Sequence, residues 1–457
     1  MDWVIHNGSV VTPQGVIHAD VGIKSERIAA VTPHVQAQQV IDASGCYVFP
    51  GFVDAHVHLQ MIVDGLMTGD DFYTGTVAAA CGGTTTVMDF TENVRNEDLV
   101  EAAGRRRSEA EGQVAVDYAL HLTLPDASRR TLQQLRELSK DGYASVKLYT
   151  TYEGVRLEDA EILEVLDAVR ESGLLPMVHA ENNAAIQFLT TRFLTQGRTA
   201  PSYHPLSRPP LVEAEAAQRV AALANVVGSP LYLAHVTCRE TLQAMARARD
   251  RRQIIYGETC PHYLLLSQAE YERPGFEGAK YVLSPPLRDR SNWETLWKAL
   301  ACGDLQVVST DHCPWNYSTQ KVRGKDDFSR IPNGAPGIET RVALLFTEGV
   351  AKGRLSLERF VELNASEPAR LFGLYPRKGV IAVGSDADLV IFDPNHETSV
   401  SAANLHQRVD YSPFEGWTVQ GRVRDVLLRG QPVVANGQFV GAAGQGQYVP
   451  AYPPGLW

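Results

Sequence analysis

The sequence of 457 residues predicts an α/β protein: a (β/α)8 barrel of the TIM type with a small β-sandwich domain built from both chain ends. Two observations favour this fold class. In the middle of the chain, short apolar runs alternate with segments of helical periodicity, which is typical of parallel strands joined by helical crossovers. At both ends of the chain, strand-like segments and turn signals replace that alternation.

The central region contains eight strand-like runs, several of which are continuously apolar, as expected of parallel strands buried on both faces. They are Phe52–Leu59, Thr84–Phe90, Asp117–Leu124, Ser145–Thr150, Leu175–Ala180, Leu231–Val236, Ile254–Thr259 and Leu305–Thr310. Helical patterns separate most of them, for example at Leu157–Ser172, Val212–Val227 and Ser291–Cys302. A doubly wound open sheet is the alternative, but no GxGxxG follows the first strand and no GxxxxGK occurs, so nucleotide binding has no support.

The two chain ends each look too small to form a domain alone, so we expect them to pair into one β-sandwich. Near the N-terminus, Asn7-Gly8 lies between apolar runs and predicts a hairpin turn. A second turn is expected at Asn436-Gly437. The predicted organisation is a first part of the β-sandwich at 1–51, the barrel at 52–376, the second part of the sandwich at 377–444 and a tail at 445–457.

The composition excludes several classes of partner. The chain has 42 Lys and Arg against 53 Asp and Glu residues, so its formal net charge is −11. This acidic balance argues against nucleic-acid binding and against docking on an anionic membrane. No stretch resembles a membrane span or a signal peptide. The six cysteines form no CxxC pair and resemble reduced, buried thiols, so we expect a cytoplasmic protein.

A pair of histidines stands at the end of the first predicted barrel strand, in the segment Asp54-Ala55-His56-Val57-His58. Residues i and i+2 of a strand point to the same side, so both imidazoles can face the barrel mouth. A lone histidine is usually structural, but two at this spacing indicate a metal site.

Other predicted strands end in similar residues. Because barrel active sites form at the carboxyl ends of the strands, four histidines, one lysine and one aspartate are expected to converge. These are His56, His58, Lys147, His179, His235 and Asp311. The alternative, six unrelated core or surface residues, requires a coincidence on five strands.

Lys147 lies between Val146 and Leu148 in a strand that we expect to be buried. Burial lowers the pKa of a lysine, and a neutral amine can react with CO2 to give a carbamate. That modification, N6-carboxylysine, would turn a repelling cation into an anionic bridge between two metal ions. A lysine that extends to solvent is the alternative.

Such a site predicts metal-assisted hydrolysis. Two metal ions can share a hydroxide and lower the pKa of its parent water. Asp311 could take the proton of the nucleophile and pass it to the leaving nitrogen. Mixed histidine and carboxylate ligation suits zinc, and manganese or cobalt are also compatible with it.

Several segments resemble those of the cyclic amidohydrolases of the amidohydrolase superfamily, and within them the dihydropyrimidinase/D-hydantoinase group. The resemblance covers nearly the whole chain. Its segments are Phe49 to His58, Gly82-Gly83-Thr84-Thr85-Thr86, Val178-His179-Ala180-Glu181-Asn182, Gly257-Glu258-Thr259-Cys260-Pro261, Ser284-Pro285-Pro286-Leu287-Arg288, Thr310-Asp311-His312-Cys313-Pro314 and Ile331-Pro332-Asn333-Gly334.

The resemblance implies a binuclear zinc site. One ion would be held by His56, His58 and Asp311 and the other by His179 and His235, with carbamylated Lys147 between them. Tyr152 would stabilise the oxyanion, and Ser284 and Asn333 would bind the substrate through backbone groups. The group is usually homotetrameric, so a homotetramer, or a homodimer, is expected.

The implied reaction opens the cyclic amide bond of a small ureide or imide ring. Dihydropyrimidines or 5-substituted hydantoins would give N-carbamoyl amino acids, through attack of a metal-bridging hydroxide.

Two departures from the group's pattern bear on the substrate. Ile62-Val63 replace a Pro-Phe pair in a loop that, with Tyr149, is expected to wall the pocket for the ring substituent. His262 stands where the group often has Gln, and this variant is similar to allantoinases or dihydroorotases. After His58 there is no Arg to bind the substrate carboxylate of a dihydroorotase. An allantoinase-like enzyme and a non-catalytic scaffold of the same fold therefore stay as alternatives.

Overall fold

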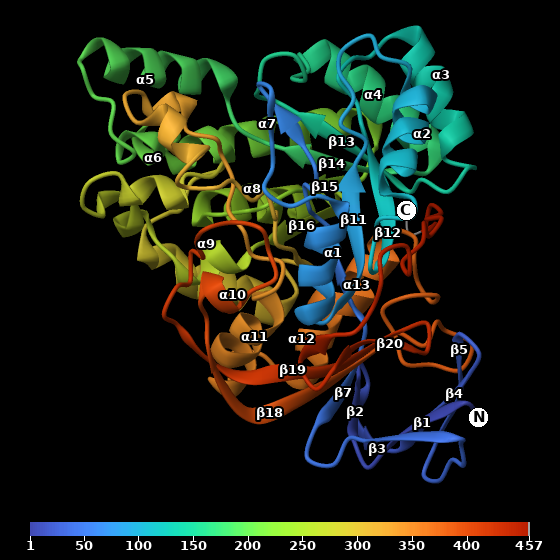
Figure 1. Ribbon diagram of the computed structural model, residues 1–457. Coiled ribbons are helices and arrows are strands. Elements are labelled where there is room, and N and C mark those ends of the chain that lie inside the picture. Colours follow the sequence, from blue (N-terminus) through green and yellow to red (C-terminus); the bar gives the residue numbers. More distant parts are fainter. Residues whose placement is uncertain (456–457) are drawn as a thin grey trace.

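The computed structural model describes residues 1–455, so the last two residues of the predicted tail, Leu456 and Trp457, lie outside the described residues. The central sheet has eight parallel strands in the order β17-β16-β15-β14-β13-β12-β11-β8 (Figure 1). An isolated parallel bridge between Val57 and His312 joins the two edge strands and closes the barrel. The strands are β8 (Phe52–Asp54), β11 (Thr84–Phe90), β12 (Asp117–Thr123), β13 (Ser145–Tyr149), β14 (Leu175–His179), β15 (Leu231–Leu233), β16 (Ile255–Thr259) and β17 (Val307–Val308).

All eight predicted barrel strands are present, but three end two or more residues before the predicted carboxyl ends. β8 ends at Asp54, β15 at Leu233 and β17 at Val308. Just beyond two of these ends, His235 and Asp311 adopt φ values of 36° and 48°. A positive φ is incompatible with an extended strand, so the chain turns where the predicted site residues begin.

The helices pack around the barrel strands (Figure 1). The three helices predicted above correspond to α4, α7 and α10 within two residues at each end. At α4 the boundaries follow from capping, since Glu158 and Glu161 form a capping box and Gly173 ends the helix with φ 70°. The α-helices are α1 (Phe72–Cys81), α2 (Leu99–Ala110), α3 (Arg129–Leu138), α4 (Asp159–Ser172), α5 (Asn183–Thr195), α6 (Tyr203–Ser207), α7 (Pro210–Val227), α8 (Arg239–Asp250), α9 (Pro261–Leu265), α10 (Trp293–Cys302), α11 (Arg341–Leu345), α12 (Leu357–Val361) and α13 (Glu367–Leu371).

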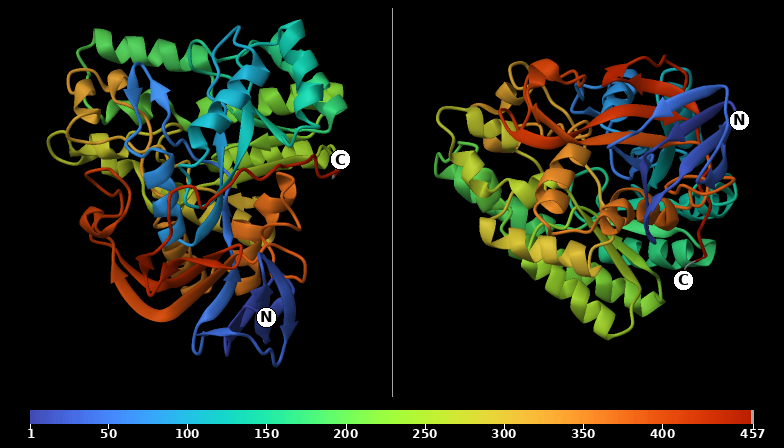
Figure 2. Two further views of the ribbon diagram at one scale, coloured as in Figure 1. Left: turned by 45° about the vertical axis from the view of Figure 1, so that its right-hand side comes forward. Right: turned by 90° about the horizontal axis from the view of Figure 1, so that it is seen from below.

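Both chain ends contribute to one seven-stranded sheet, of order β21-β20-β19-β18-β7-β2-β3, which confirms the predicted β-sandwich (Figure 2). The two ends meet where β18 pairs antiparallel with β7, with Leu389 opposite Pro50. A four-stranded sheet of order β5-β4-β1-β6 completes the sandwich. The strands are β1 (Trp3–His6), β2 (Ser9–Thr12), β3 (Gly15–His18), β4 (Asp20–Lys24), β5 (Arg27–Thr32), β6 (Gln39–Asp42), β7 (Tyr47–Pro50), β18 (Leu389–Ser399), β19 (Thr418–Leu428), β20 (Gln431–Ala435) and β21 (Gln438–Phe439).

One of the two predicted turns is a hairpin and the other is not. Asn436-Gly437 connects the antiparallel pair β20 and β21, as expected. The hairpin prediction at Asn7-Gly8 is wrong, because β1 belongs to the four-stranded sheet and β2 to the seven-stranded one. Asn7 has φ 62°, so it turns the chain, but the turn leads from one sheet to the other.

A buried charge cluster fastens the sandwich to the barrel. Lys378 Nζ lies 2.5 Å from Asp117 at the start of β12 and 2.7 Å from Asp388, just before β18. The end of the chain then runs back along the barrel, where Val449 donates to the carbonyl of Tyr118 at 2.8 Å (Figure 2). Among residues 1–455, no helix has the length and apolar character needed to cross a membrane.

Candidate metal centre

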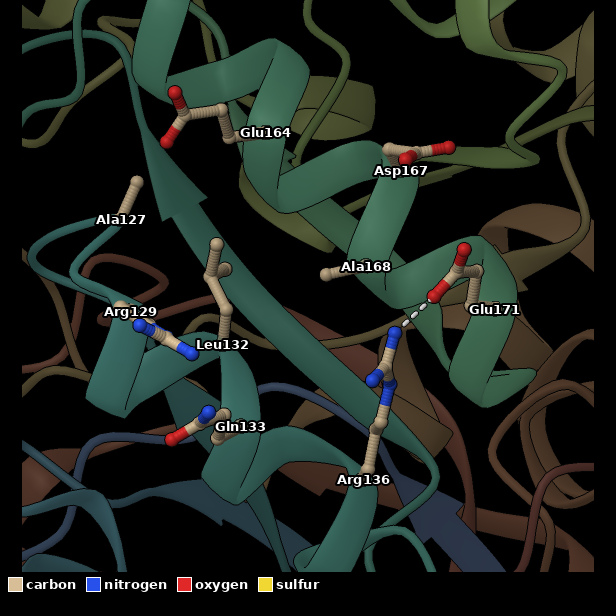
Figure 3. Close-up of a pocket in the computed structure, with 9 residues that line it drawn as sticks. All are labelled: Ala127, Arg129, Leu132, Gln133, Arg136, Glu164, Asp167, Ala168 and Glu171. Carbon is tan, nitrogen blue, oxygen red and sulfur yellow. Dashed lines mark hydrogen bonds and ion pairs between the residues drawn. The ribbon is translucent and has the colours of Figure 1, made fainter.

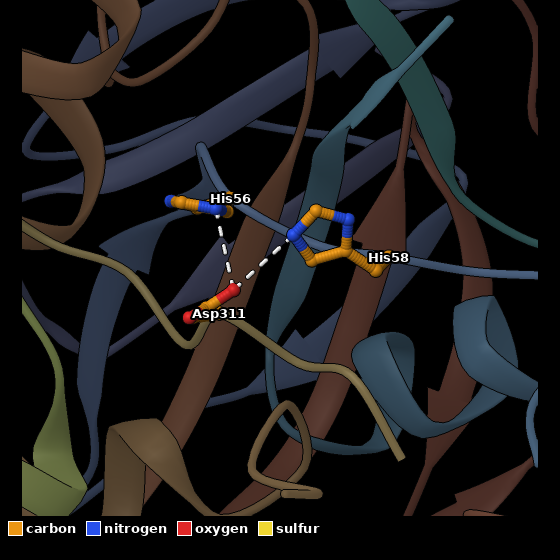
Figure 4. Close-up of side chains that lie close together, drawn as sticks. All are labelled: His56, His58 and Asp311. Carbon is orange, nitrogen blue, oxygen red and sulfur yellow. Dashed lines mark ion pairs between the residues drawn. The ribbon is translucent and has the colours of Figure 1, made fainter. Parts of the chain in front are cut away.

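Two histidines and one aspartate meet at the carboxyl ends of β8 and β17 (Figure 4). The Nε2 atoms of His56 and His58 each lie 3.2 Å from Oδ1 of Asp311. His56 and His58 are buried, and the side chain of Asp311 is 16% exposed. Three lone-pair-bearing atoms therefore converge on one point, and these residues could hold a divalent metal ion.

The other nitrogen of each of these histidines faces a glutamate. His56 Nδ1 lies 2.5 Å from Glu258, which is fully buried at the end of β16, and His58 Nδ1 lies 3.3 Å from Glu92. A carboxylate on one ring nitrogen fixes the tautomer and leaves the other nitrogen free to bind a metal. The two glutamates therefore orient both imidazoles toward Asp311.

His179 and His235 form a second group beside the first. Their ring centroids are 4.5 Å apart, and the ring of His235 is 5.6 Å from that of His56. His179 Nε2 lies 2.8 Å from Glu181, whose charge is shared with Arg208, so Nδ1 of His179 is left free. Nδ1 of His235 is buried and has no hydrogen-bond partner in the described chain.

Lys147, the middle residue of β13, lies beside the first of these two groups. Its Nζ atom is 3.4 Å from Nε2 of His56 and 5.0 Å from the ring centre of Phe90, and the residue is 1% exposed. Burial lowers the pKa of Lys147 to about 8, although Asp311 and Glu258 act in the opposite direction. Because Lys147 is buried, the alternative that its side chain extends to solvent is excluded.

The charges of the centre are strongly coupled. Burial raises the pKa of Asp311, but His56, His58 and His235 outweigh it and hold that pKa well below its usual range. Burial lowers the pKa of His58, but hydrogen bonds to Asp311 and Glu92 outweigh it and raise the pKa to about 9. Without a metal ion, the site therefore holds an anionic carboxylate and a protonated imidazole, and an ion must displace that proton.

Three of the predicted site residues have a backbone conformation that side chains rarely adopt. The φ values are 75° at Tyr152, 36° at His235 and 48° at Asp311. Such conformations cost roughly 1–3 kcal/mol each and persist where the surrounding structure imposes them. Here they aim three side chains from three loops toward the same space.

The predicted substrate-binding residues also lie together. Ser284 Oγ donates to Oδ1 of Asn333 at 2.9 Å. Burial raises the pKa of Tyr152, while Arg208 and a hydrogen bond with Ser284 lower it, which leaves the phenol protonated. The ring of Tyr152 is 5.0 Å from that of His179, so this trio borders the candidate metal centre.

A second buried lysine, which the sequence did not single out, ties the two substrate-binding segments together. Lys321 is fully buried, and its Nζ donates to the carbonyls of Val282 at 2.9 Å and Pro332 at 3.0 Å. These carbonyls lie two residues before Ser284 and one before Asn333. Burial lowers the pKa of Lys321 to about 7, so the amine can hold both carbonyls without a full charge.

Two histidines without a predicted role differ in their surroundings. His312 is satisfied, since Nε2 lies 3.1 Å from Asp70 and Nδ1 accepts from the backbone of Gly337 at 3.1 Å. It therefore anchors the loop that carries Asp311. His262 is buried with Nε2 unpartnered among residues 1–455, and burial lowers its pKa to about 4.

Glu92, Glu181, Glu258 and Lys321 were not among the site residues that the sequence predicted. Glu181 and Glu258 stand within motifs that were recognised as segments, but nothing local shows which histidine each glutamate faces. Glu92 is separated from His58 by 34 positions in the sequence, and Glu258 is separated from His56 by 202. Only the closed barrel brings them together.

A surface hollow elsewhere on the barrel is unrelated to the site. It measures about 420 Å³ and lies between α3 and α4, lined by polar and charged side chains such as Arg136 and Glu171, which form an ion pair (Figure 3). None of the predicted site residues lines it.

Residues 47–433 match the model of the Amidohydrolase family. The chain is 45% identical to the D-hydantoinase of Ralstonia pickettii, over 98% of both chains, and 46% identical to that of Geobacillus stearothermophilus, over 98% of this chain and 96% of that one. The crystal structure of dihydropyrimidinase from Brevibacillus agri NCHU1002 superposes with a TM-score of 0.98 at 45% identity, covering 99% of each chain. The chain thus belongs to the amidohydrolase family and, within it, to the group that contains the dihydropyrimidinases and D-hydantoinases.

Proposed function

We propose that this protein is a metal-dependent cyclic amidase that opens 5-substituted hydantoins or dihydropyrimidines to N-carbamoyl amino acids. The observation that carries the proposal is the convergence of His56, His58 and Asp311 beside Lys147, on a chain that is 45% identical to a D-hydantoinase over nearly its full length. The catalytic and binding roles below are parts of this proposal.

The donor atoms present fit a pair of divalent ions. One ion would be held by His56, His58 and Asp311, and the other by His179 and His235, whose buried and unpartnered Nδ1 is consistent with an electrophile nearby. Zn2+ suits this mixture of imidazole and carboxylate. When bound, the two ions supply a nucleophile by acidifying a shared water, and they polarise the carbonyl under attack.

Lys147 would join the two ions as its carbamate, N6-carboxylysine. Its lowered pKa would supply the neutral amine that reacts with CO2, and its position 3.4 Å from His56 supports a role beside the predicted ligands. The reaction forms a bond from Nζ to the carbon of CO2 and releases one proton. Two dications facing a lysine cation would repel it strongly, whereas a carbamate anion offsets their charge.

Asp311 and Tyr152 would act on the reacting atoms. The low pKa of Asp311 keeps it ionised, so it can accept the proton of the attacking water and then deliver it to the leaving ring nitrogen. Tyr152 stays protonated at neutral pH, so its hydroxyl can donate a hydrogen bond to the oxyanion that develops on the attacked carbonyl.

The backbone of the substrate-binding segments complements the edge of a ureide ring. Within residues 1–455, the carbonyl oxygen of Ser284 and the N–H of Asn333 take part in no hydrogen bond. An unused acceptor beside an unused donor matches the adjacent N–H and C=O groups of a cyclic imide or ureide. This arrangement supports a neutral ring as substrate.

The ring substituent would lie against an apolar hairpin. β9 (Ile62–Val63) and β10 (Leu66–Met67) pair antiparallel, and the side chains of Ile62 and Met67 are largely exposed. With Tyr149, this hairpin would favour apolar substituents at ring position 5.

A substrate panel tests the proposal. Zinc-loaded protein is expected to hydrolyse dihydrouracil or at least one 5-substituted hydantoin, such as phenylhydantoin, measured by release of the N-carbamoyl product. Allantoin is the comparison arm, because His262 is the only residue that favours an allantoinase-like enzyme. Faster turnover of allantoin would replace the proposal, and no turnover of any ring in metal-loaded protein would favour the scaffold.

We further propose the division of the chain given by the sequence, with the barrel at 52–376 between the two parts of the sandwich, at 1–51 and 377–444, and a tail at 445–457. We also propose that the protein assembles as a homotetramer or homodimer in the cytoplasm. Sedimentation analysis of the purified protein tests the assembly.

A further inference from the structure

Three donor side chains from separate segments meet at the carboxyl end of α1, outside the candidate metal centre. Cys81 is the last residue of α1, Glu339 precedes α11, and His406 lies in the loop after β18. One donor atom of each residue lies within 4.8 Å of the other two. His406 Nδ1 is 2.8 Å from Oε1 of Glu339, and the N–H of His406 donates to Oε2 at 2.7 Å.

We propose that Cys81, Glu339 and His406 bind one divalent ion of the zinc class, separate from the candidate metal centre. Sulfur, imidazole nitrogen and carboxylate oxygen are the three donor types that zinc uses in proteins. A thiolate and a carboxylate neutralise the two positive charges of the ion, so the occupied site carries no net charge. Water would complete the tetrahedron.

The spacing of the donors is close to what a tetrahedral ion requires. Bonds of about 2.0–2.3 Å place neighbouring donor atoms roughly 3.3–3.8 Å apart. Donor atoms at the observed limit of 4.8 Å would have to approach by about 1–1.5 Å, whereas Nδ1 of His406 and Oε1 of Glu339, at 2.8 Å, would have to separate by about 0.5–1 Å. The side chain of Glu339 is only 8% exposed and is therefore held in place, whereas that of His406 is 33% exposed, so an ion can reach the site from solvent on its side.

The surroundings favour a cation. The carboxyl end of a helix carries partial negative charge, and the last turn of α1 contains no basic residue. Burial and the charge of Glu339 raise the pKa of the Cys81 thiol, so this thiol is protonated in the absence of an ion. Binding would consequently release a proton, since only the thiolate is a strong ligand.

The ion would attach the loop after β18 to the carboxyl end of α1. The backbone of Arg408, two residues after His406, donates to Asp70 at 2.7 Å, and Asp70 also contacts His312. The side chain of Arg408 also pairs with Asp71, the N-cap of α1, at 2.9 Å, so three carboxylates already hold this loop. An ion at Cys81 would add a further attachment, at the carboxyl end of α1, without touching the predicted catalytic residues.

Cadmium titration of the full-length protein, loaded beforehand with only the two equivalents of zinc that the candidate metal centre would hold, tests the site. Cadmium bound to thiolate gives a charge-transfer absorption band, and the candidate metal centre contains no cysteine ligand, so the band reports a cysteine site. In wild-type protein and in Cys302→Ser, which removes an exposed cysteine, the band is expected to saturate near one equivalent. It should be absent in Cys81→Ser, and excess zinc should remove it from wild-type protein.

His406→Asn is the second variant, because its partly exposed side chain makes misfolding less of a concern. Loss of one of three protein ligands should weaken cadmium binding by about tenfold or more. Absence of the band in folded wild-type protein, its persistence in Cys81→Ser or in excess zinc, or unchanged affinity in His406→Asn would each overturn the assignment. The band needs no hydrolytic activity, so failure of the proposed function leaves this test intact.

Discussion

The Nδ1 atom of His56 lies 2.5 Å from Oε1 of Glu258, and the Nε2 atom of the same ring lies 3.2 Å from Asp311. The glutamate is fully buried and also accepts hydrogen bonds from Tyr232 at 2.9 Å and Ser309 at 2.7 Å. One carboxylate thus fixes the tautomer of a predicted metal ligand. Because Glu258 is not one of the predicted ligands, its contribution can be measured separately from theirs.

Replacement Glu258→Gln should lower metal affinity by about 10–100-fold, because the amide no longer fixes the free nitrogen of His56 toward Asp311. Bound metal after dialysis against graded chelator measures the effect. Tyr232→Phe is the matched control, because it removes one hydrogen bond to the Glu258 carboxylate but keeps the contact of that carboxylate with His56. Its metal affinity should fall less than that of Glu258→Gln. Wild-type affinity in Glu258→Gln would contradict the orienting role.

Replacement Lys147→Ala should lower kcat by more than about 100-fold, because the predicted bridge between the two ions is lost. A small carboxylate such as acetate should restore part of the activity by occupying the vacated space. Lys325→Ala, at an exposed lysine, serves as the control and should match wild type. Full activity in Lys147→Ala would refute the bridging role.

Replacement Tyr152→Phe should reduce kcat by roughly 10²–10³-fold, the usual effect of removing one oxyanion donor. KM and metal content should change little, because the ring and its packing against His179 remain. Tyr149→Phe, whose ring lies 6.0 Å from that of Tyr152, is the comparison. Equal kcat losses in the two variants would argue against a specific donor at Tyr152.

Replacement Lys321→Met should raise KM by about tenfold and change kcat less. The carbonyls of Val282 and Pro332 would lose their donor, and the segments that carry Ser284 and Asn333 would lose their fixed spacing. Steady-state kinetics beside Lys325→Met, at an exposed lysine, provides the measurement. An unchanged KM in a folded Lys321→Met variant would remove Lys321 from substrate positioning.

Stability should also depend on pH through Lys321. Its pKa is about 7 in the folded protein and about 10.4 in an unfolded chain, so between these values the unfolded state holds the extra proton. Stability from this group therefore rises with pH over that window, by at most about 1.4 kcal/mol per unit. The difference in unfolding free energy between wild type and Lys321→Met should shift by roughly 2–2.5 kcal/mol from pH 7.5 to 9.5 in favour of wild type. A difference that is constant over this range would count against a neutral buried amine.

The alternation of apolar runs and helical periods determined the barrel, because that pattern follows from local burial and repeats eight times along the chain. At both chain ends, strand-like segments and turn signals indicated the sandwich, but the local sequence did not show which strands pair with each other. Asn7-Gly8 has the sequence of a hairpin turn, yet the strands it joins belong to different sheets. Which sheet a strand enters depends on partners far away in sequence, such as β7 and β18.

The sequence by itself singled out the six predicted ligands, because each stands in the middle of a predicted strand, in its carboxyl half or just after it, and the carboxyl ends of the strands meet at one face of a barrel. It could not show that His56 faces Glu258, that His58 faces Glu92, or that Lys321 joins two loops. Those contacts link residues 34 to 202 positions apart, or lie between segments without periodicity. Only closure of the barrel and packing of its loops decide them, since burial and hydrogen bonding there depend on the whole fold.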